Sequence, residues 1–373
     1  MQRSLLNLAI VGISFGLVAC GSDDDSTTQD ERSIIDTSTY AAIDATQGRA
    51  YLDLESGHSV TSEDQWHMSY QKYVGFSING GISGERGVSA CVANVPEGIY
   101  DAEGAPVQSA FESLTRENTL AGFNSVTIES CDEFEEDSLK LQIQMEDWLE
   151  ADYSQGAPVY SASEADSNGW IIQSASKNEA DAYEYGRVHV NNVVYISGEK
   201  RAITLSVEAW DSNAEAFSGS VNSPELNFTD GRVYWDLETN SVVTSEDNWE
   251  LSIVSNGYSW DIQVNGGASG NGAAAVGTLL VDSAYDVTSP APGSSGDVYK
   301  YYADSASSIL SGPGNYGALH YGVDDSHNMW PNFTTYLFKD GDRYYKAQVV
   351  SNYGEDGTLS SGNLYIRYAE VLQ

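Results

Sequence analysis

The sequence predicts an all-β protein, and composition, alternation of apolar residues and turn chemistry lead to that prediction. The 373 residues include 24 Tyr, 8 Trp and 35 Gly but only 8 Pro, and aromatic and β-branched residues separated by glycines are typical of short strands. No long stretch shows the 3.6-residue period of an amphipathic helix. Four segments instead show the two-residue period of a half-buried strand: residues 139–145, 233–237, 249–253 and 260–264.

Four short polar segments predict turns between such strands. Residues 79–81 and 265–267 both read Asn-Gly-Gly, residues 339–342 read Lys-Asp-Gly-Asp, and residues 354–357 read Gly-Glu-Asp-Gly. Asn, Asp and Gly tolerate the positive φ angles that tight turns require. We therefore expect hairpins at these positions.

An internal repeat is the most informative feature of the sequence. Arg-Ala-Tyr-Leu-Asp-Leu-Glu at residues 49–55 returns as Arg-Val-Tyr-Trp-Asp-Leu-Glu at residues 232–238, which is 183 positions later. Further matches follow in the same order: residues 60–64 with 243–247, Trp66 with Trp249, residues 79–84 with 265–270, and Tyr100-Asp101 with Tyr285-Asp286. So many ordered matches indicate a duplication.

The distal parts of the two copies match less well. Tyr185-Gly186 resembles Tyr321-Gly322, which aligns Glu184 of the first copy with His320 of the second. Residues 194–196 resemble residues 335–337 in the same way.

The N-terminus predicts an exported lipoprotein. Arg3 precedes an apolar run at residues 5–17 that is shorter than a membrane span, and Ala19 then precedes Cys20. A small residue before the cleavage site fits a signal peptidase, and a Cys directly after that site is where a lipoprotein receives its lipid. The alternatives are an ordinary secretory signal with a chance Cys, or an uncleaved anchor.

The segment after Cys20 predicts a tether and a destination. Residues 21–30 are polar and acidic, and such a segment cannot bury a core. Gly21 is not the Asp that usually retains lipoproteins at the inner membrane, so we expect the outer membrane, on its periplasmic or cell-surface face.

Each copy is far longer than a solenoid repeat, so we expect two tandem domains. The predicted organisation is a signal peptide at residues 1–19, a lipidated Cys and disordered acidic tether at 20–47, a first repeat at 48–212 that is degenerate in its C-terminal part, a linker at 213–227 and a second repeat at 228–373.

Charge and cysteine usage restrict the possible partners. There are 17 basic and 55 acidic residues, a net charge of −38, which argues against binding to nucleic acid or to an anionic membrane surface. A salty habitat, surface cation binding and simple solubility are all compatible with this acidity.

Cys91 and Cys131 remain besides Cys20, and two cysteines in an exported domain most often pair, so we expect a disulfide within the first copy.

Each copy resembles the HmuY family of bacterial haem-binding outer-membrane lipoproteins. The resemblance covers nearly all of residues 228–373 and the front of the first copy. It rests on five motifs of the second copy: an aromatic-x-x-Leu strand at 234–237, a Trp-led strand at 249–253, Asn-Gly-Gly-x-Ser-Gly at 265–270, Tyr-Tyr-Lys at 344–346 and a last aromatic strand at 364–368.

The resemblance implies an all-β protein that captures haem outside the cell and holds the iron with side chains from loops. Imidazole nitrogen and thioether sulfur are both good axial ligands to haem iron. The candidate iron ligands are His327, His320 and Met329, and the candidate aromatic walls are Tyr321, Trp330 and Tyr316.

We expect one haem per chain, bound by the second copy. Asp324 and Asp325 are expected to accept a hydrogen bond from the His327 ring and so to orient its other nitrogen. The alternative is that His320 and His327 are exposed loop histidines without a ligand.

The functional expectation is therefore haem acquisition by a non-enzyme. The implied partners are haem or haemoproteins, a TonB-dependent outer-membrane receptor and the membrane that holds the lipid anchor. The G-x-G-x-x-G at residues 312–317 lacks the βαβ context of a dinucleotide site, and we find no nucleophile with a placed base. The alternative function is a non-haem surface module that binds a glycan or a protein on the same β scaffold.

Overall fold

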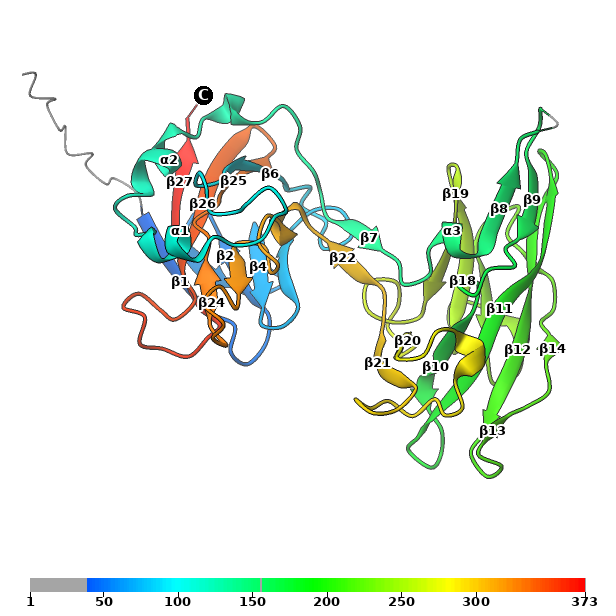
Figure 1. Ribbon diagram of the computed structural model, residues 1–373. Helices are drawn as coiled ribbons and strands as arrows, with labels where there is room; N and C mark the ends of the chain where they lie inside the picture. Colours follow the sequence, from blue (N-terminus) through cyan, green and yellow to red (C-terminus); the bar gives the residue numbers. More distant parts are fainter. Residues whose placement is uncertain (1–38, 155, 373) are drawn as a thin grey trace, which may run out of the picture. The chain divides into compact units, whose positions relative to one another are not determined.

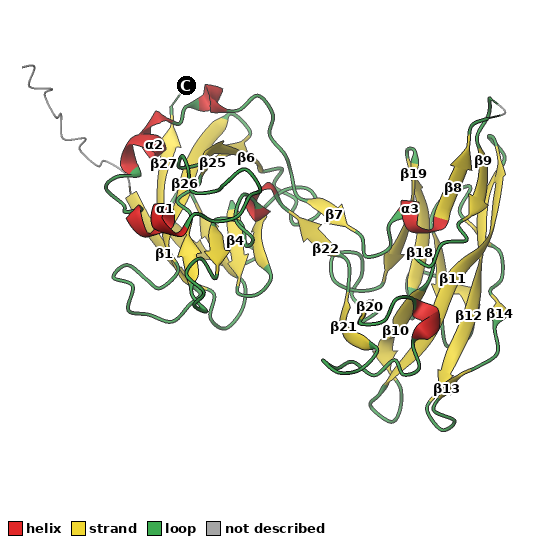
Figure 2. Cartoon of the chain, viewed as in Figure 1, coloured by secondary structure: helices red, strands yellow, loops and turns green. Residues whose placement is uncertain are grey.

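The computed structural model describes residues 39–154 and 156–372 (Figure 1). The predicted signal peptide, Cys20 and residues 21–38 of the predicted tether lie outside the described residues. The tether expected over residues 20–47 is wrong at its end, because Thr39–Asp44 form a strand that pairs with the last strand of the chain. Strands make up 47% of the described residues and helices 8% (Figure 2), so the predicted all-β class is confirmed. Among the described residues, no helix is both long and apolar enough to span a membrane.

The first β structure, which we call the outer module, is built from residues 39–137 and 308–372. Its larger sheet is antiparallel, in the order β1-β27-β26-β25-β6: Thr39–Asp44, Asn363–Val371, Arg343–Ser351, Thr335–Asp340 and Ser89–Asn94. Its smaller sheet runs β3-β2-β4-β5: His58–Val60, Ala50–Asp53, Met68–Gln71 and Gly75–Ile78. Inward residues of both sheets share one core that contains Leu52, Ile78, Phe338 and Ile366, all fully buried.

The second β structure, the inner module, is built from residues 141–304. Its larger sheet runs β13-β12-β11-β10-β20-β21: Ala216–Phe217, Lys200–Asp211, Tyr183–Ile196, Trp170–Lys177, Ala275–Leu279 and Val298–Tyr302. The short strands β14 (Val221–Asn222) and β15 (Leu226–Asn227) also pair with β12. The linker expected over residues 213–227 is therefore wrong, because this segment belongs to the sheet. Its smaller sheet runs β17-β16-β18-β19: Ser241–Val243, Val233–Asp236, Leu251–Asn256 and Ser259–Val264. Its core contains Trp148, Trp235, Leu251 and Ile203.

The strand pairing does not follow the expected tandem domains. Strand β6 of the first copy pairs with β25 of the second, with Ser89 opposite Lys339. Strand β10 of the first copy pairs with β20 of the second, with Gln173 opposite Ala275. Each module therefore combines the front half of one copy with the back half of the other. A repeat in sequence identifies equivalent segments but does not say which copy each one pairs with.

Two buried aspartates lie where the chain passes from one module to the other. Asp137 accepts a hydrogen bond from the Ile78 amide at 3.1 Å, and Asp304 accepts the equivalent bond from Val264 at 3.0 Å. Burial raises the pKa of both carboxyls. Each aspartate is followed directly by a short strand, and these strands, β7 (Ser138–Lys140) and β22 (Ser305–Ser307), pair antiparallel with each other.

The Asn-Gly-Gly segments are not the hairpin turns that the sequence predicts. Gly81 forms a parallel bridge with Asp137, and Gly267 forms the same bridge with Asp304. A Cβ atom on either glycine would lie 2.0 Å from the aspartate carbonyl oxygen, and both have a φ near +60°. These glycines therefore permit the close backbone approach that secures each crossing.

Other local expectations have mixed outcomes. The hairpin at residues 339–342 is confirmed, because Asp340 pairs with Arg343 across it. The strand expected over residues 139–145 is wrong beyond Lys140, since the chain next forms helix α3 (Met145–Trp148). The alignment of the distal parts of the two copies is also wrong. Strand β10 pairs with β20 and strand β25 pairs with β6, so β10 is the counterpart of β25. The sequence alignment instead matches β25 with residues 194–196 of β11.

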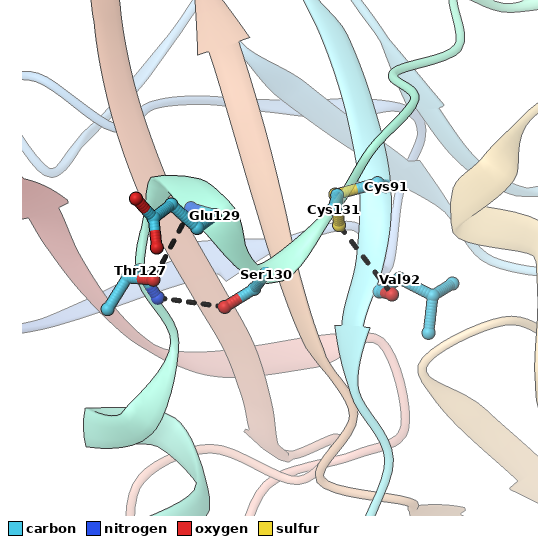
Figure 3. The surroundings of a disulfide bond; sticks show 6 residues. All are labelled: Cys91, Val92, Thr127, Glu129, Ser130 and Cys131. Carbon is cyan, nitrogen blue, oxygen red and sulfur yellow. Dashed lines mark hydrogen bonds between the residues drawn. A yellow bond between two sulfur atoms is a disulfide. The ribbon is translucent and has the colours of Figure 1, made fainter.

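The disulfide predicted within the first copy is present between Cys91 and Cys131 (Figure 3). Cys91 lies on β6, and Cys131 follows a 3₁₀ helix, Ile128–Ser130, whose first turn is capped by the Thr127 side chain. The disulfide therefore links the 3₁₀-helical segment to strand β6, which itself pairs with β25.

The Tyr-Tyr-Lys motif has a structural role in the outer module. The Lys346 ammonium group is buried and donates to the carbonyl oxygens of Phe123 and Val126 at 2.9 and 3.1 Å. These carbonyls lie at the C-terminal end of helix α2 (Leu120–Ser125). The last carbonyl groups of a helix have no partner within the helix, and a cation is favourable there. Desolvation lowers the pKa of Lys346. Strand β26 of the second copy thus binds a helix of the first.

Replacement of Gly81 by Ala should destabilise the protein far more than replacement of Gly98. Both glycines have positive φ, but space is open around Gly98, so Gly98→Ala should cost about 1 kcal/mol for conformation alone. Gly81→Ala must also displace the Asp137 backbone, and we expect a loss of about 3 kcal/mol or more. Urea denaturation of the two variants measures the difference. Equal losses would show that the close approach does not support the fold.

Candidate functional site

The predicted haem residues lie on a two-stranded ribbon of the outer module. Strands β23 (Leu319–Tyr321) and β24 (Met329–Pro331) pair antiparallel, with His320 opposite Trp330 and Tyr321 opposite Met329. Opposed residues share a face of a ribbon, and successive residues take opposite faces. His320 and Trp330 therefore lie on one face, and Tyr321 and Met329 on the other.

The face that carries Tyr321 also holds His327. The Tyr321 hydroxyl is hydrogen-bonded to Nδ1 of His327 at 2.5 Å, and the two rings stack with an interplanar angle of 24°. Tyr321 also contacts Tyr316 edge to face, with both rings about two-fifths exposed. The Met329 amide donates to the Tyr353 hydroxyl at 3.0 Å. The Met329 side chain is half-buried and packs against the core of the outer module, so the exposed part of this face is formed by His327, Tyr321 and Tyr316.

The opposite face buries His320. Its ring is 8% exposed and packs against Tyr100 and Phe111, with centroids 5.6 and 5.8 Å away. Desolvation lowers the pKa of His320, so the ring is neutral at pH 7. Its Nδ1 is buried without a hydrogen-bond partner among the described residues.

Two expectations about this loop need correction. His320 and His327 lie on opposite faces of the ribbon, so this arrangement does not bring them together as a ligand pair. Asp324 accepts hydrogen bonds from the Ser326 amide and from the Trp330 indole, whereas Tyr321 contacts the His327 ring. The sequence did not identify Tyr321 as the hydrogen-bond partner of the His327 ring. The pairing register of the two short strands that brings them together cannot be predicted from a glycine-rich segment.

The sequence also missed the neighbours of His320. Tyr100 and Phe111 belong to the first copy, and they meet His320 only because the copies exchange halves. One signal was available, since Tyr100 is a repeated residue whose counterpart is Tyr285. In the inner module Tyr285 also contacts a histidine, His189, at a centroid distance of 5.7 Å. Desolvation lowers the pKa of His189 as well.

A second titratable cluster in the outer module surrounds His67. The ring is fully buried, and its Nδ1 accepts a hydrogen bond from the Leu54 amide at 3.1 Å. Asp53 lies 3.1 Å from Nδ1 and Asp340 lies 3.5 Å from Nε2, while Arg86 pairs with Asp340 at 2.7 Å. Desolvation, aided by Arg86, lowers the pKa of His67 to about 4 despite the two carboxylates.

The equivalent position in the inner module is Glu250. Its carboxylate accepts hydrogen bonds from the Leu237 and Ala175 amides at 2.6 and 2.8 Å. Asp236 and Glu238 each bring an oxygen within 4.8 Å of it, so the three could in principle hold a metal ion. Both Glu250 oxygens already serve backbone amides, however, and desolvation raises its pKa to about 7. The cluster is explained as a structural anchor.

No protein-family model matches the chain, and a search of curated proteins also gives no match. The functional argument therefore rests on the residues and their geometry.

The two equivalent positions should give opposite pH dependences of stability. The folded pKa of His67 is lower than its ordinary 6.5, so its contribution is present above pH 6.5 and is lost as the pH falls toward 4. The folded pKa of Glu250 is higher than its ordinary 4.5, so its contribution is present below pH 4.5 and is lost as the pH rises through 7. Each contribution amounts to at most about 3 kcal/mol.

Urea denaturation from pH 4 to 8 tests this expectation. His67→Gln should flatten the loss of stability on acidification, and Glu250→Gln should flatten the loss on alkalinisation. If His67→Gln loses as much stability as the wild type on acidification, or Glu250→Gln as much on alkalinisation, then that residue does not cause the pH dependence assigned to it.

Proposed function

We propose that this chain is a haem-binding lipoprotein that serves iron acquisition, with His327 as the principal iron ligand. The observation that carries the proposal is the hydrogen bond between the Tyr321 hydroxyl and Nδ1 of His327. A haem or metal histidine typically uses one ring nitrogen for iron while the other is fixed by a hydrogen bond. This bond occupies Nδ1 and leaves Nε2 available on an exposed face.

The surroundings of His327 suit a flat ligand with a metal centre. Met329 lies on the same side of the ribbon, with its half-buried side chain packed against the core, and it would have to turn outward to offer its thioether as the second axial ligand. Tyr316 and Tyr321 present partly exposed rings beside it, and such rings would cover part of a porphyrin. Haem would supply a Lewis-acidic iron, and the protein would supply the ligands and the aromatic cover.

Localisation and partners belong to the same proposal. The N-terminal pattern before Cys20 supports export and a lipid anchor at the outer membrane, and the resemblance to the HmuY family supports haem or haemoproteins as the source and a TonB-dependent receptor as the recipient. The disulfide between Cys91 and Cys131 fits an oxidising compartment outside the cytoplasm. No catalytic role is part of the proposal.

Haem binding should depend on His327 more than on any other histidine. In a haemin titration of the full chain followed at the Soret band, His327→Ala should weaken binding by about tenfold or more, since it removes an axial ligand. His320→Ala should have a smaller effect, through the packing of the ribbon. Met329→Ala should retain binding with the spectrum of five-coordinate iron.

His58→Ala is the matched control, because His58 is an exposed histidine of β3 in the same module and is not part of the ribbon. It should leave the titration unchanged. The full chain is required because residues 228–373 alone lack the front half of the outer module. A flat wild-type titration would refute haem binding and favour the non-haem surface module.

A further inference from the structure

An open groove of about 570 Å³ runs along the inner module, whereas the ribbon that carries the proposed haem site belongs to the outer module. One wall comes from β9 (Val159–Ala162) and the turn after it, the other from β11 and from Tyr285. Strand β9 pairs with β8 (Leu149–Asp152), and this hairpin lies beside β11 in Figure 1. The volume lies in the range of sites that hold small ligands.

The floor of the groove is fixed by one buried amide. The Asn168 side chain donates to the Ser163 and Val190 carbonyls and accepts from the Val190 amide, at 2.8, 2.8 and 2.9 Å. It thereby ties the turn after β9 to β11. The groove is preorganised by this contact, which limits the entropy that a ligand must overcome.

A β-bulge directs two amides to the groove. The register of β11 with β12 shifts between Val190 and Asn192, so Asn191 is an extra residue. Bulges re-aim side chains and often occur beside functional sites. Asn191 and Asn192 are both exposed and line the groove. The Asn191 amide nitrogen donates to Oδ1 of Asn222 at 3.3 Å, which leaves its carbonyl oxygen as an acceptor, and the Asn192 amide can donate and accept hydrogen bonds.

Two tyrosines line the groove: Tyr160 is half-buried and packs against the core of the inner module, and Tyr285 is exposed. Tyr160 packs edge to face on Tyr195 and also contacts Trp260, which fixes its ring. Tyr285 is 45% exposed and lies in a 3₁₀ helix that Arg187 fastens by donating to the Ala284 carbonyl at 2.8 Å. An exposed ring of this kind can stack against an apolar ring face of a ligand.

The charge of the groove selects the ligand class. Among the described residues that line it there is one carboxylate, Glu164, and neither Lys nor Arg. Anionic ligands are therefore disfavoured, all the more on a chain with a net charge of −38. A single exposed carboxylate is also too little for a metal ion. Amides, hydroxyls, an imidazole and two phenol rings match a neutral ligand rich in hydroxyl groups.

We propose that this groove binds a neutral oligosaccharide, which stacks on Tyr285 and Tyr160 and exchanges hydrogen bonds with Asn191 and Asn192. The site is separate from the proposed haem site and does not depend on it. The chain would then attach to a glycan through the inner module and bind haem through the outer one.

Isothermal titration calorimetry of the full chain tests the proposal with defined probes. These are oligosaccharides of glucose, galactose, mannose and N-acetylglucosamine, and oligogalacturonate as the acidic series. At least one neutral series should bind saturably, and the acidic series should bind at least tenfold more weakly. Asn192→Ala and Tyr285→Ala should each weaken the neutral ligand by about tenfold.

Tyr299→Ala is the matched control, since Tyr299 is a partly exposed tyrosine of β21 in the same module and outside the groove. It should bind like the wild type. The absence of saturable binding to all four neutral series would overturn the proposal. So would preferred binding of oligogalacturonate, or binding that Asn192→Ala and Tyr285→Ala leave intact.

Discussion

The buried carboxylates of Asp137 and Asp304 secure the two points at which the chain leaves one module for the other. Each accepts a hydrogen bond from the strand that precedes its Asn-Gly-Gly segment, and each backbone is bridged to the second glycine of that segment. A side chain at either glycine would overlap the aspartate backbone. The Asn-Gly-Gly motif is therefore needed for the chain to cross between the modules at these two points. The repeated motif is thus explained by architecture, without a ligand.

The exchange of halves brings residues of both copies together around the buried and half-buried histidines, whereas the exposed face with His327 belongs to the second copy alone. His320 comes from the second copy and meets Tyr100 of the first, whereas His189 of the first meets Tyr285 of the second. The same scaffold position has diverged in polarity, since His67 in one module corresponds to Glu250 in the other. In both cases the side chain accepts a hydrogen bond from the amide of the repeated leucine. The anchoring hydrogen bond is thus present in both modules, with an imidazole as the acceptor in one and a carboxyl group in the other.

Sequence reasoning predicted what local patterns determine. The alternating segments at residues 233–237 and 260–264 form β16 and β19, and the two cysteines pair. It failed where long-range choices decide: no local pattern tells whether β6 pairs with β10 or with β25, because the competing strands are related by duplication. The same limit hid the partner of His327, since the ribbon register that brings Tyr321 to it depends on a loop conformation. The alternation at residues 139–145 misled because Ile143 is buried through a single bridge, outside any strand.

The exchange of halves is tested most directly by introduced cysteine pairs. In the exchanged arrangement Ser89 lies opposite Lys339, whereas in a tandem arrangement its partner would be Gln173, which instead lies opposite Ala275. The double variant Ser89→Cys with Lys339→Cys should form a disulfide in the oxidised full chain, and Ser89→Cys with Gln173→Cys should not, as peptide mapping by mass spectrometry would show. A disulfide between positions 89 and 173, with none between 89 and 339, would contradict the exchanged fold.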